Sequence, residues 1–188
     1  MIGNDLIDFG ACRNYRPDRW RAYWAKVLLP EEWDNFRFEA NDPAAWIYWA
    51  AKESAWKVWF RRSAKRLLNP KAFHLDSIEW EGSLGRFRVK GPEHIYIGRA
   101  LMEAESLHAW VWIEAFGEAA ITNPCVASCQ KSQIEQVAIA SLPPSIIADQ
   151  ILRDQQGIPH FAKDGNTLNI PLSLSHHGSR AAFAYVYP

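Results

Sequence analysis

One long helix, predicted from Pro43 to Leu68, constrains the fold of this chain more than any other segment. Asp42 is a favourable N-cap residue and Pro43 suits the first helical position, whereas Asn69-Pro70 would end the helix. Four of the ten tryptophans of the chain lie in this segment, at Trp46, Trp49, Trp56 and Trp59. We expect a sheet to pack against this aromatic helix.

Strand patterns occur on both sides of the helix. Short stretches that alternate apolar and polar residues, or that are rich in Val, Ile and Trp, predict strands at Ile2–Phe9, Ser77–Glu81, Gly85–Val89, His94–Ile97 and Leu107–Phe116. The tail from Leu168 to Tyr187 predicts two further strands around a turn at Ser175-His176-His177-Gly178.

The remaining patterns predict helices and the class of the fold. Further helices are expected at Pro17–Trp24, from Pro30, and from Pro143-Pro144 through Gln155. Residues 118–143 give no clear pattern. The chain is therefore expected to be α+β, with an antiparallel sheet packed against the long helix. A length of 188 residues suits one domain, which could divide into lobes at 1–120 and 121–188.

Composition narrows the choice of partners and compartment. Lys plus Arg equals Asp plus Glu, so the overall charge favours no particular partner, and we expect neither nucleic acid nor membrane. No apolar run approaches the roughly 18 residues that span a bilayer, and the first residues lack the pattern of a secretory signal. Three cysteines without paired-ligand spacing suit a reducing cytoplasm.

Glu53 is the charged residue of the long helix whose position is least expected. At helical spacing it shares a face with Trp46, Trp49 and Trp56, and Lys57 follows one turn later. An ordinary solvent-exposed ion pair between Glu53 and Lys57 is one interpretation. The aromatic neighbours favour another, because a carboxylate in apolar surroundings needs a cation, which could be Lys57, a metal ion or both.

Two other segments carry candidate functional residues. Asp5 follows Gly3 on the first strand, and a second carboxylate beside Glu53 could complete a site for a hard cation such as Mg²⁺. In the tail, Ser175 and His176 either cap a turn or bind a phosphate through hydroxyl and imidazole donors. Because adjacent residues of a strand point to opposite faces, His176 and His177 are not expected to share a ligand.

Together, and in this order, three segments resemble the signatures of the 4′-phosphopantetheinyl transferase superfamily. They are Gly3-Asn4-Asp5, Lys52-Glu53-Ser54-Ala55-Trp56-Lys57 and Ser173-Leu174-Ser175-His176. The stretch Val27-Leu28-Leu29-Pro30-Glu31-Glu32 is similar to the segment that precedes the Lys-Glu helix in holo-acyl-carrier-protein synthases. The resemblance covers about 1–68 and 151–187 well and the middle of the chain loosely.

The resemblance implies a reaction and a role for each residue. Asp5 and Glu53 would bind Mg²⁺, Lys57 would neutralise phosphate charge, and Ser175, His176 and Lys52 would bind phosphates of coenzyme A. The carrier serine, deprotonated by Glu53 or by a water on the metal, would attack the phosphate nearer the pantetheine and release adenosine 3′,5′-bisphosphate. Asp8 matches a frequent acidic residue of the family and is a candidate for supporting a metal ligand.

The partner implied by the resemblance is an apo acyl carrier protein or a peptidyl carrier domain. Four arginines lie within nine residues after the first strand: Arg13, Arg16, Arg19 and Arg21. Their composition alone suits a solvated surface equally well. In the family, however, a basic patch at this place meets the acidic helix of the carrier, which would set the association rate and orientation.

Two positions depart from the family pattern. Gly157-Ile158-Pro159 stands where the family often has Gly-Lys-Pro, so a phosphate-contacting lysine is missing, with Lys163 the nearest substitute. Ile7 stands where the larger, surfactin-type enzymes carry a third acidic ligand. These departures keep a second function open, in which the chain only binds coenzyme A or a carrier protein. An unrelated magnesium-dependent nucleotide enzyme is disfavoured because no phosphate-binding glycine-rich loop is present.

The order of the motifs suggests a rearranged topology. The surfactin-type enzymes are pseudodimers in which Ser-x-Ser-His nearly adjoins Gly-x-Asp, whereas here Gly-x-Asp opens the chain and Ser-x-Ser-His nearly closes it. We hypothesise a circular permutation relative to that type, which predicts that the Ile2–Phe9 and Ala181–Tyr187 strands pair and that Met1 and Pro188 lie close together. A monomer would then complete its own site, whereas the compact synthases form trimers.

Overall fold

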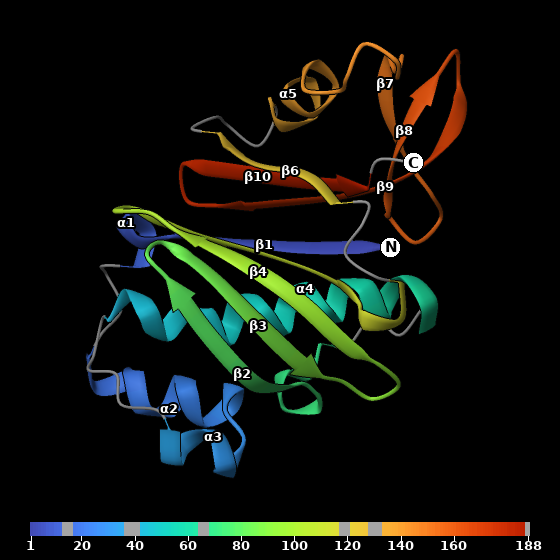
Figure 1. Cartoon of the computed structure of the whole chain (residues 1–188). Helices are drawn as coiled ribbons and strands as arrows, with labels where there is room; N and C mark the ends of the chain where they lie inside the picture. Colours follow the sequence, from blue (N-terminus) through green and yellow to red (C-terminus); the bar gives the residue numbers. More distant parts are fainter. Residues whose placement is uncertain (13–16, 36–41, 64–67, 117–120, 128–132, 187–188) are drawn as a thin grey trace.

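The computed structural model describes residues 1–12, 17–35, 42–63, 68–116, 121–127 and 133–186. Two five-stranded antiparallel sheets make up most of this part of the chain (Figure 1). The first sheet, in the order β1-β5-β4-β3-β2, contains β1 (Ile2–Asp8), β2 (His74–Glu81), β3 (Leu84–Lys90), β4 (Ile95–Met102) and β5 (Ser106–Ile113). The second, in the order β6-β10-β9-β8-β7, contains β6 (Ile121–Ala127), β7 (Gln150–Arg153), β8 (Pro159–Lys163), β9 (Asn166–His177) and β10 (Arg180–Val186).

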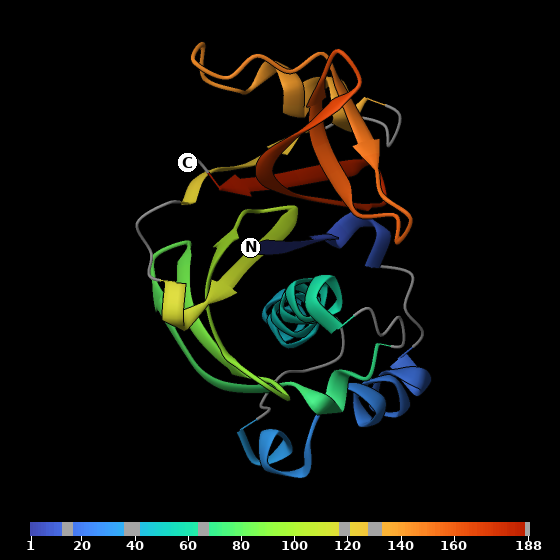
Figure 2. The same ribbon diagram turned by 90° about the vertical axis from the view of Figure 1, so that its right-hand side faces the viewer.

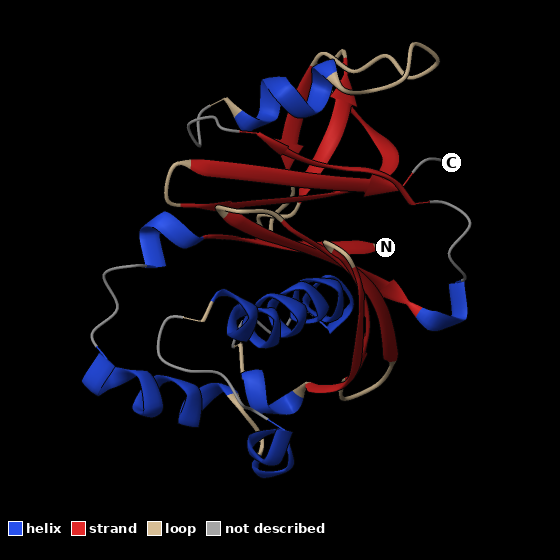
Figure 3. Cartoon of the chain, turned by 60° about the vertical axis from the view of Figure 1, so that its left-hand side comes forward, coloured by secondary structure: helices blue, strands red, loops and turns tan. Residues whose placement is uncertain are grey.

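Helices pack against both sheets. They are α1 (Phe9–Cys12), α2 (Pro17–Val27), α3 (Pro30–Asn35), α4 (Trp46–Ser63) and α5 (Ile134–Ala140), with short 3-10 turns at Pro43–Ala45, Pro70–Ala72 and Glu114–Phe116. The long helix α4 lies in the hollow of the curved first sheet (Figure 2). Figure 3 shows α5 above the second sheet, so the two sheets meet between α4 and α5. The predicted α+β class, with an antiparallel sheet against a long helix, is confirmed.

The start of α4 follows the predicted capping chemistry. The Asp42 side chain accepts a hydrogen bond from the Ala44 backbone N–H at 2.8 Å, and Pro43 occupies the first position of the 3-10 turn that leads into α4. Behind this start, the rings of Trp24 and Trp46 meet edge to face at 5.5 Å, which packs α2 against α4. The tryptophans of the helix therefore help to form the larger of the hydrophobic cores.

Helix α4 packs against β1 at Gly3 with almost no space between the two backbones. A Cβ atom at Gly3 would lie 2.1 Å from the carbonyl oxygen of Ser54, far closer than van der Waals contact allows. The hydroxyl of Ser54 donates to the Ala109 carbonyl of β5 at 3.2 Å and fixes the helix on the sheet. Because β-strand residues alternate between faces, Asp5 and Ile7 share the α4 face of β1 with Gly3.

The two sheets meet along the free edge of β1. Its backbone N–H groups at Asn4 and Asp8 donate to side chains of β9, namely Ser173 Oγ at 3.0 Å and His177 Nδ1 at 2.8 Å. An unpaired edge strand would leave such groups without partners, so β9 satisfies the edge with side chains instead of backbone. A small apolar cluster that includes Ile2, Trp110, Trp112 and Ala184 fills the rest of this junction.

Most of the predicted elements are present. The strands predicted at 2–9 and 77–116 correspond to β1 to β5, and the two tail strands to β9 and β10, with ends shifted by a few residues. The helix predicted from Pro17 extends to Val27. The long helix is described to Ser63, and the next four residues lie outside the described part of the chain.

Two predictions are wrong. The helix expected from Pro143-Pro144 through Gln155 does not form, because residues 150–153 instead pair with β8 as strand β7. The strand Ile2–Phe9 does not pair with Ala181–Tyr187. Strand β1 pairs with β5, and β10 has β6 and β9 on its two edges, which leaves no edge for a third partner. The expected proximity of Met1 and Pro188 involves a residue outside the described part of the chain.

The contact at Gly3 predicts the effect of adding a single methyl group. Gly3→Ala would place Cβ against the Ser54 carbonyl, so α4 has to move away from β1. We expect a loss of about 3 kcal/mol in the free energy of unfolding, measured by urea denaturation. Gly157→Ala is the control, because Gly157 has open space around it and a φ of +82°, so only backbone strain of about 1 kcal/mol is expected. Equal losses in both variants would contradict the packing argument.

Candidate active site

Asp5, Glu53 and Lys57 form one cluster at the contact between β1 and α4. The Lys57 ammonium lies 3.2 Å from Asp5 Oδ1 and 3.2 Å from Glu53 Oε1. It also donates to the Asn4 backbone carbonyl at 2.7 Å. The strand face fixes Asp5, and the i,i+4 spacing on α4 fixes the other two. Glu53 and Lys57, which follow Asp5 by about fifty positions in the sequence, thereby lie next to it in the fold.

The cluster combines burial with an excess of negative charge. The side chain of Asp5 is 8% exposed, whereas those of Lys57 and Glu53 are 19% and 23% exposed. Burial raises the pKa of Asp5 to about 7, against the opposing effect of Lys57 and with a further contribution from the Glu53 carboxylate. Burial acts to lower the pKa of Lys57, but the two carboxylates outweigh it and raise that pKa. One ammonium therefore serves two carboxylates.

The donor set of this cluster fits a hard divalent cation. Among the described residues, the buried Oδ2 atom of Asp5 has no hydrogen-bond donor. Mg²⁺ typically uses one or two protein carboxylates together with water and substrate phosphates, which Asp5 and Glu53 could provide. No group of three or more His, Cys, Asp or Glu side chains in the described ranges is arranged to hold a metal. Ile7, on the same face of β1, is buried in the core and offers no third ligand.

A buried polar network connects β1 to β9 beside this cluster. The Asn4 side-chain amide donates to Ser175 Oγ at 2.9 Å and lies 3.1 Å from His108 Nε2. Burial lowers the pKa of His108 to about 3, with Lys57 adding to the effect, so the imidazole is neutral near pH 7. A neutral ring with Nε2 as acceptor suits the amide donor of Asn4. The network thus positions Ser175 relative to the strand that carries Asp5.

The two adjacent histidines of β9 point in opposite directions. His177 lies on the β1 face with Ser173 and Ser175, and its Nδ1 accepts from the Asp8 N–H. His176 is exposed and lies on the opposite face of the strand. The prediction that the two histidines do not share a ligand agrees with this arrangement. The structure brings Ser175 next to Asn4, whereas His176 is not brought to the Asp5 cluster.

Asp8 holds the turn between β9 and β10 against the end of β1. Its Oδ2 accepts from the backbone N–H and the hydroxyl of Ser179, and its Oδ1 accepts from Gly10 and, at 3.4 Å, from Ala11. Burial acts to raise the pKa of Asp8, but these donated hydrogen bonds lower it. Asp8 is therefore a structural carboxylate whose acceptor positions are filled by backbone N–H groups and the Ser179 hydroxyl.

The match to a family model coincides with this geometry. Residues 1–110 of the chain match the model of the 4′-phosphopantetheinyl transferase superfamily, a span that includes Asp5, Glu53 and Lys57. The chain belongs to this superfamily. No curated protein and no solved structure gave a significant match to the chain.

Membership of the phosphopantetheinyl transferase superfamily supports a transferase that moves phosphopantetheine and implies carrier proteins as its partners in general. Ser175 and His176 lie outside the matched residues. In the described ranges no helix is long and apolar enough to cross a membrane.

The Lys52 side chain lies away from the other predicted site residues. Its ammonium forms an ion pair with Glu32 at 2.5 Å, and both side chains are 1% exposed. It also donates to the Val27 carbonyl at 2.8 Å, while Glu32 accepts from the Leu29 and Leu75 backbone N–H groups. Lys52 thus links α4 to the Val27–Glu32 stretch. The expected contact of Lys52 with coenzyme A has no support in this geometry.

The arginines predicted to meet the carrier protein are partly described. Arg19 and Arg21 are exposed on α2, while Arg13 and Arg16 lie outside the described residues. Lys163, the sequence-based substitute for the missing lysine, is exposed at the end of β8. Ile158 lines a pocket that also contains Arg61 of α4.

Several residues of the site were not predicted from the sequence. Asn4, Ser173 and His177 connect the two sheets, and His108 of β5 lies beside Asn4. Arg61 lies one turn beyond Lys57 on α4. The period-two series Ser173, Ser175, His177 was a usable signal, because alternate residues of a strand share a face. Nothing in the sequence pattern linked His108 to Asn4, since that contact depends on the pairing of β1 with β5.

The buried pair of Lys52 and Glu32 predicts a stability role for Lys52. Lys52→Met would leave the Glu32 carboxylate buried without its cation, so we expect a loss of about 3–5 kcal/mol in the free energy of unfolding. Lys71→Met, at an exposed lysine, is the control and should change it by less than about 0.5 kcal/mol. A Lys52→Met protein of unchanged stability that binds coenzyme A weakly would contradict this interpretation and support a phosphate contact.

Proposed function

We propose that this chain is a Mg²⁺-dependent 4′-phosphopantetheinyl transferase that moves the phosphopantetheine of coenzyme A onto a serine of an apo carrier protein. The observation that supports this most is the cluster of Asp5, Glu53 and Lys57, in which two carboxylates share one ammonium beside an unpartnered buried oxygen. Membership of the superfamily gives the reaction class. The fold and the residue positions then suggest which groups perform it.

Asp5 and Glu53 are the residues that would hold the metal. When bound, Mg²⁺ would neutralise charge on the pyrophosphate of coenzyme A. Asp5 supplies its buried Oδ2, and Glu53 supplies a partly exposed carboxylate that a substrate can reach. A cation next to Asp5 would also offset the desolvation of its carboxylate.

Lys57 and Glu53 have complementary tasks in the transfer. Glu53 accepts the proton of the carrier serine while the hydroxyl oxygen of that serine attacks the phosphorus nearer the pantetheine. The bond between that phosphorus and the bridging oxygen breaks, and the electron pair leaves with adenosine 3′,5′-bisphosphate. Lys57 stabilises the charge that develops on the leaving phosphate and can supply its proton. Its bonds to Asn4, Asp5 and Glu53 keep the ammonium in place.

The carrier protein and the phosphates of coenzyme A would meet this cluster from its surroundings. We propose that Ser175 and His176 contact coenzyme A phosphates, with Asn4 holding Ser175. The exposed arginines of α2, Arg19 and Arg21, would face the acidic helix of an acyl or peptidyl carrier, with Arg13 and Arg16 beside them in the sequence.

We further propose that the fold is that of the superfamily in a circularly permuted arrangement. Strands β1 and β9 lie side by side although they come from opposite ends of the sequence, and Asn4 and Asp8 connect them. This supports a site completed within one chain, hence a monomer, although β1 and β10 do not pair. A trimer, as in the compact synthases, is the alternative state.

The function is tested by incubating the protein with coenzyme A, Mg²⁺ and an apo carrier protein. Intact-mass measurement of the carrier should show the addition of phosphopantetheine. Glu53→Gln should reduce the transfer rate at least a hundred-fold, because the variant loses a metal ligand and a proton acceptor. Its stability should change by less than about 1 kcal/mol, since Glu53 makes a single, partly exposed ion pair.

Glu79→Gln is the matched control, because Glu79 is an exposed glutamate on β2, away from α4. It should transfer at the rate of the unchanged protein. Full activity of Glu53→Gln would refute the assigned role. Tight coenzyme A binding without modification of any acyl or peptidyl carrier tested would refute the enzyme and favour the binding module.

A further inference from the structure

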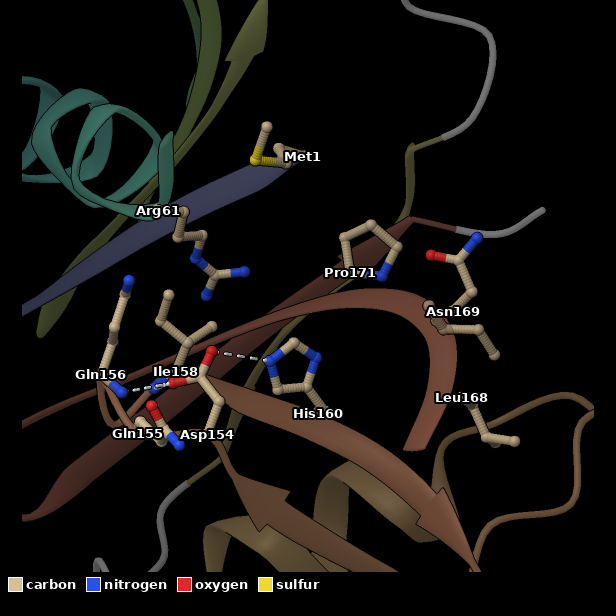
Figure 4. Close-up of a pocket in the computed structure, with 11 residues that line it drawn as sticks. Met1, Arg61, Asp154, Gln155, Gln156, Ile158, His160, Leu168, Asn169 and Pro171 are labelled. Atoms are coloured by element: carbon tan, nitrogen blue, oxygen red, sulfur yellow. Dashed lines mark hydrogen bonds and ion pairs between the residues drawn. The ribbon is translucent and has the colours of Figure 1, made fainter. Parts of the chain in front are cut away.

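His108 of β5 is a buried titratable residue that the proposed transfer does not use. It is 1% exposed, and it shares its face of the strand with Trp110, which packs with Ala184 of the second sheet. His108 is not among the residues that line the cavity beside Arg61 (Figure 4). Among the described residues, its one hydrogen-bond contact joins Nε2 to the Asn4 side-chain nitrogen at 3.1 Å. His108 can therefore act on the candidate site only through Asn4.

Asn4 connects His108 to three groups of the candidate site. Its backbone carbonyl accepts from Lys57 at 2.7 Å, and its backbone N–H donates to Ser173 Oγ at 3.0 Å. Its side-chain amide donates to Ser175 Oγ at 2.9 Å. Asn4 is fully buried, so water does not replace these partners. A change in the orientation of the Asn4 amide therefore acts directly on Ser175.

The orientation of the Asn4 amide decides what the Ser175 hydroxyl can do. With Nδ2 toward Ser175, as in the structure, the amide donates to Oγ and the hydroxyl hydrogen stays free for another acceptor. With Oδ1 toward Ser175, the hydroxyl would donate its hydrogen to the amide instead. Because phosphate oxygens accept hydrogen bonds, only the first orientation leaves Ser175 able to donate to a phosphate.

The His108 ring favours the first orientation. Burial lowers the pKa of His108 to about 3, so the ring is neutral near pH 7, and with its hydrogen on Nδ1 it presents Nε2 as an acceptor. Both side-chain N–H groups of Asn4 then have acceptors, Nε2 of His108 and Oγ of Ser175. Among the described residues, Asn4 Oδ1 has no partner, and a buried carbonyl oxygen lacks a partner more often than a buried N–H group does.

We infer that His108 is a positioning residue, which keeps the Ser175 hydroxyl available to a phosphate of coenzyme A by accepting a hydrogen bond from the Asn4 amide. The inference rests on the proposed function, and it gives a role in that function to a side chain too deeply buried to touch the substrate. Without the acceptor at Nε2, the amide can turn and Ser175 can donate to Oδ1. The phosphate then loses a hydrogen bond although Ser175 itself is unchanged.

The state of the ring is tested on the unchanged protein by NMR of nitrogen-labelled histidine, because the two neutral tautomers give different nitrogen shifts. The His108 signals are those that disappear in His108→Gln. We expect hydrogen on Nδ1 and none on Nε2 near pH 7. Hydrogen on Nε2 would overturn the inference, because the ring would then donate to Asn4 Oδ1 and turn the amide the other way.

The consequence for binding is tested by calorimetric titration of coenzyme A without a carrier protein. Ser175→Ala should weaken binding about ten-fold or more, the range for a hydrogen bond to a charged group, and His108→Leu about three- to ten-fold. In a Ser175→Ala background, His108→Leu should cost less than a further two-fold or so, because its effect passes through the hydroxyl. His108→Gln keeps a carbonyl acceptor for Asn4 and should bind within about two-fold of the unchanged protein.

His74→Leu is the control, because His74 lies on β2 at the opposite edge of the first sheet, and it should not change the affinity. Losses that add in the double variant would overturn the inference, since a general disturbance of the junction predicts that result. Unchanged binding by Ser175→Ala would overturn it as well, as would a loss in His108→Gln equal to that in His108→Leu. If His108→Leu does not fold, the tautomer measurement and His108→Gln decide.

These outcomes are separate from a failure of the proposed function. Absence of any coenzyme A binding by the unchanged protein would refute the proposed function together with this inference. Coenzyme A binding without carrier modification would refute only the proposed transfer, and the titrations would still decide the role of His108.

Discussion

The close contact between α4 and β1 at Gly3 is the constraint on which the candidate site depends. Only a residue without Cβ lets the Ser54 carbonyl approach the strand so closely. At that separation the Lys57 side chain reaches the Asn4 carbonyl and both carboxylates, Asp5 and Glu53. The glycine of the Gly-x-Asp motif and the helix of the Lys-Glu motif thus have a common physical purpose, which is to place three charged groups at one contact.

The free edge of β1 explains how the tail of the chain joins this contact. Ser173 and His177 of β9 accept hydrogen bonds from backbone N–H groups of β1 that would otherwise bond to a neighbouring strand. The Asn4 side chain also links Ser175 to β1. Side-chain capping of an edge is specific, because each hydroxyl or imidazole has to meet one particular N–H. The second sheet is therefore held in a defined register next to Asp5, and the cavity at Arg61 lies along the same junction.

The sequence contained the elements and the three charged residues, but not the directions of several side chains. Asp42, Pro43 and the tryptophans identified α4, and the spacing of Glu53 and Lys57 placed them on one face. The role of Lys52 depends on Glu32, whose position is set by tertiary packing of α3 and β2, so the local pattern could not reveal it. Strand β7 forms because β8 offers a partner, although Pro143-Pro144 suggested a helix start. Likewise, only the pairing of β9 decides which of His176 and His177 faces β1.

The most direct test of the central claim, that Asp5, Glu53 and Lys57 bind the metal and the pyrophosphate, is a crystal structure with coenzyme A and Mn²⁺ in place of Mg²⁺. The anomalous signal of manganese locates the ion without reference to any expected geometry. We expect one peak in contact with the carboxylates of Asp5 and Glu53 and with the pyrophosphate, and Lys57 in contact with the same phosphates. A manganese ion bound elsewhere, or a pyrophosphate that does not reach Lys57, would contradict the claim.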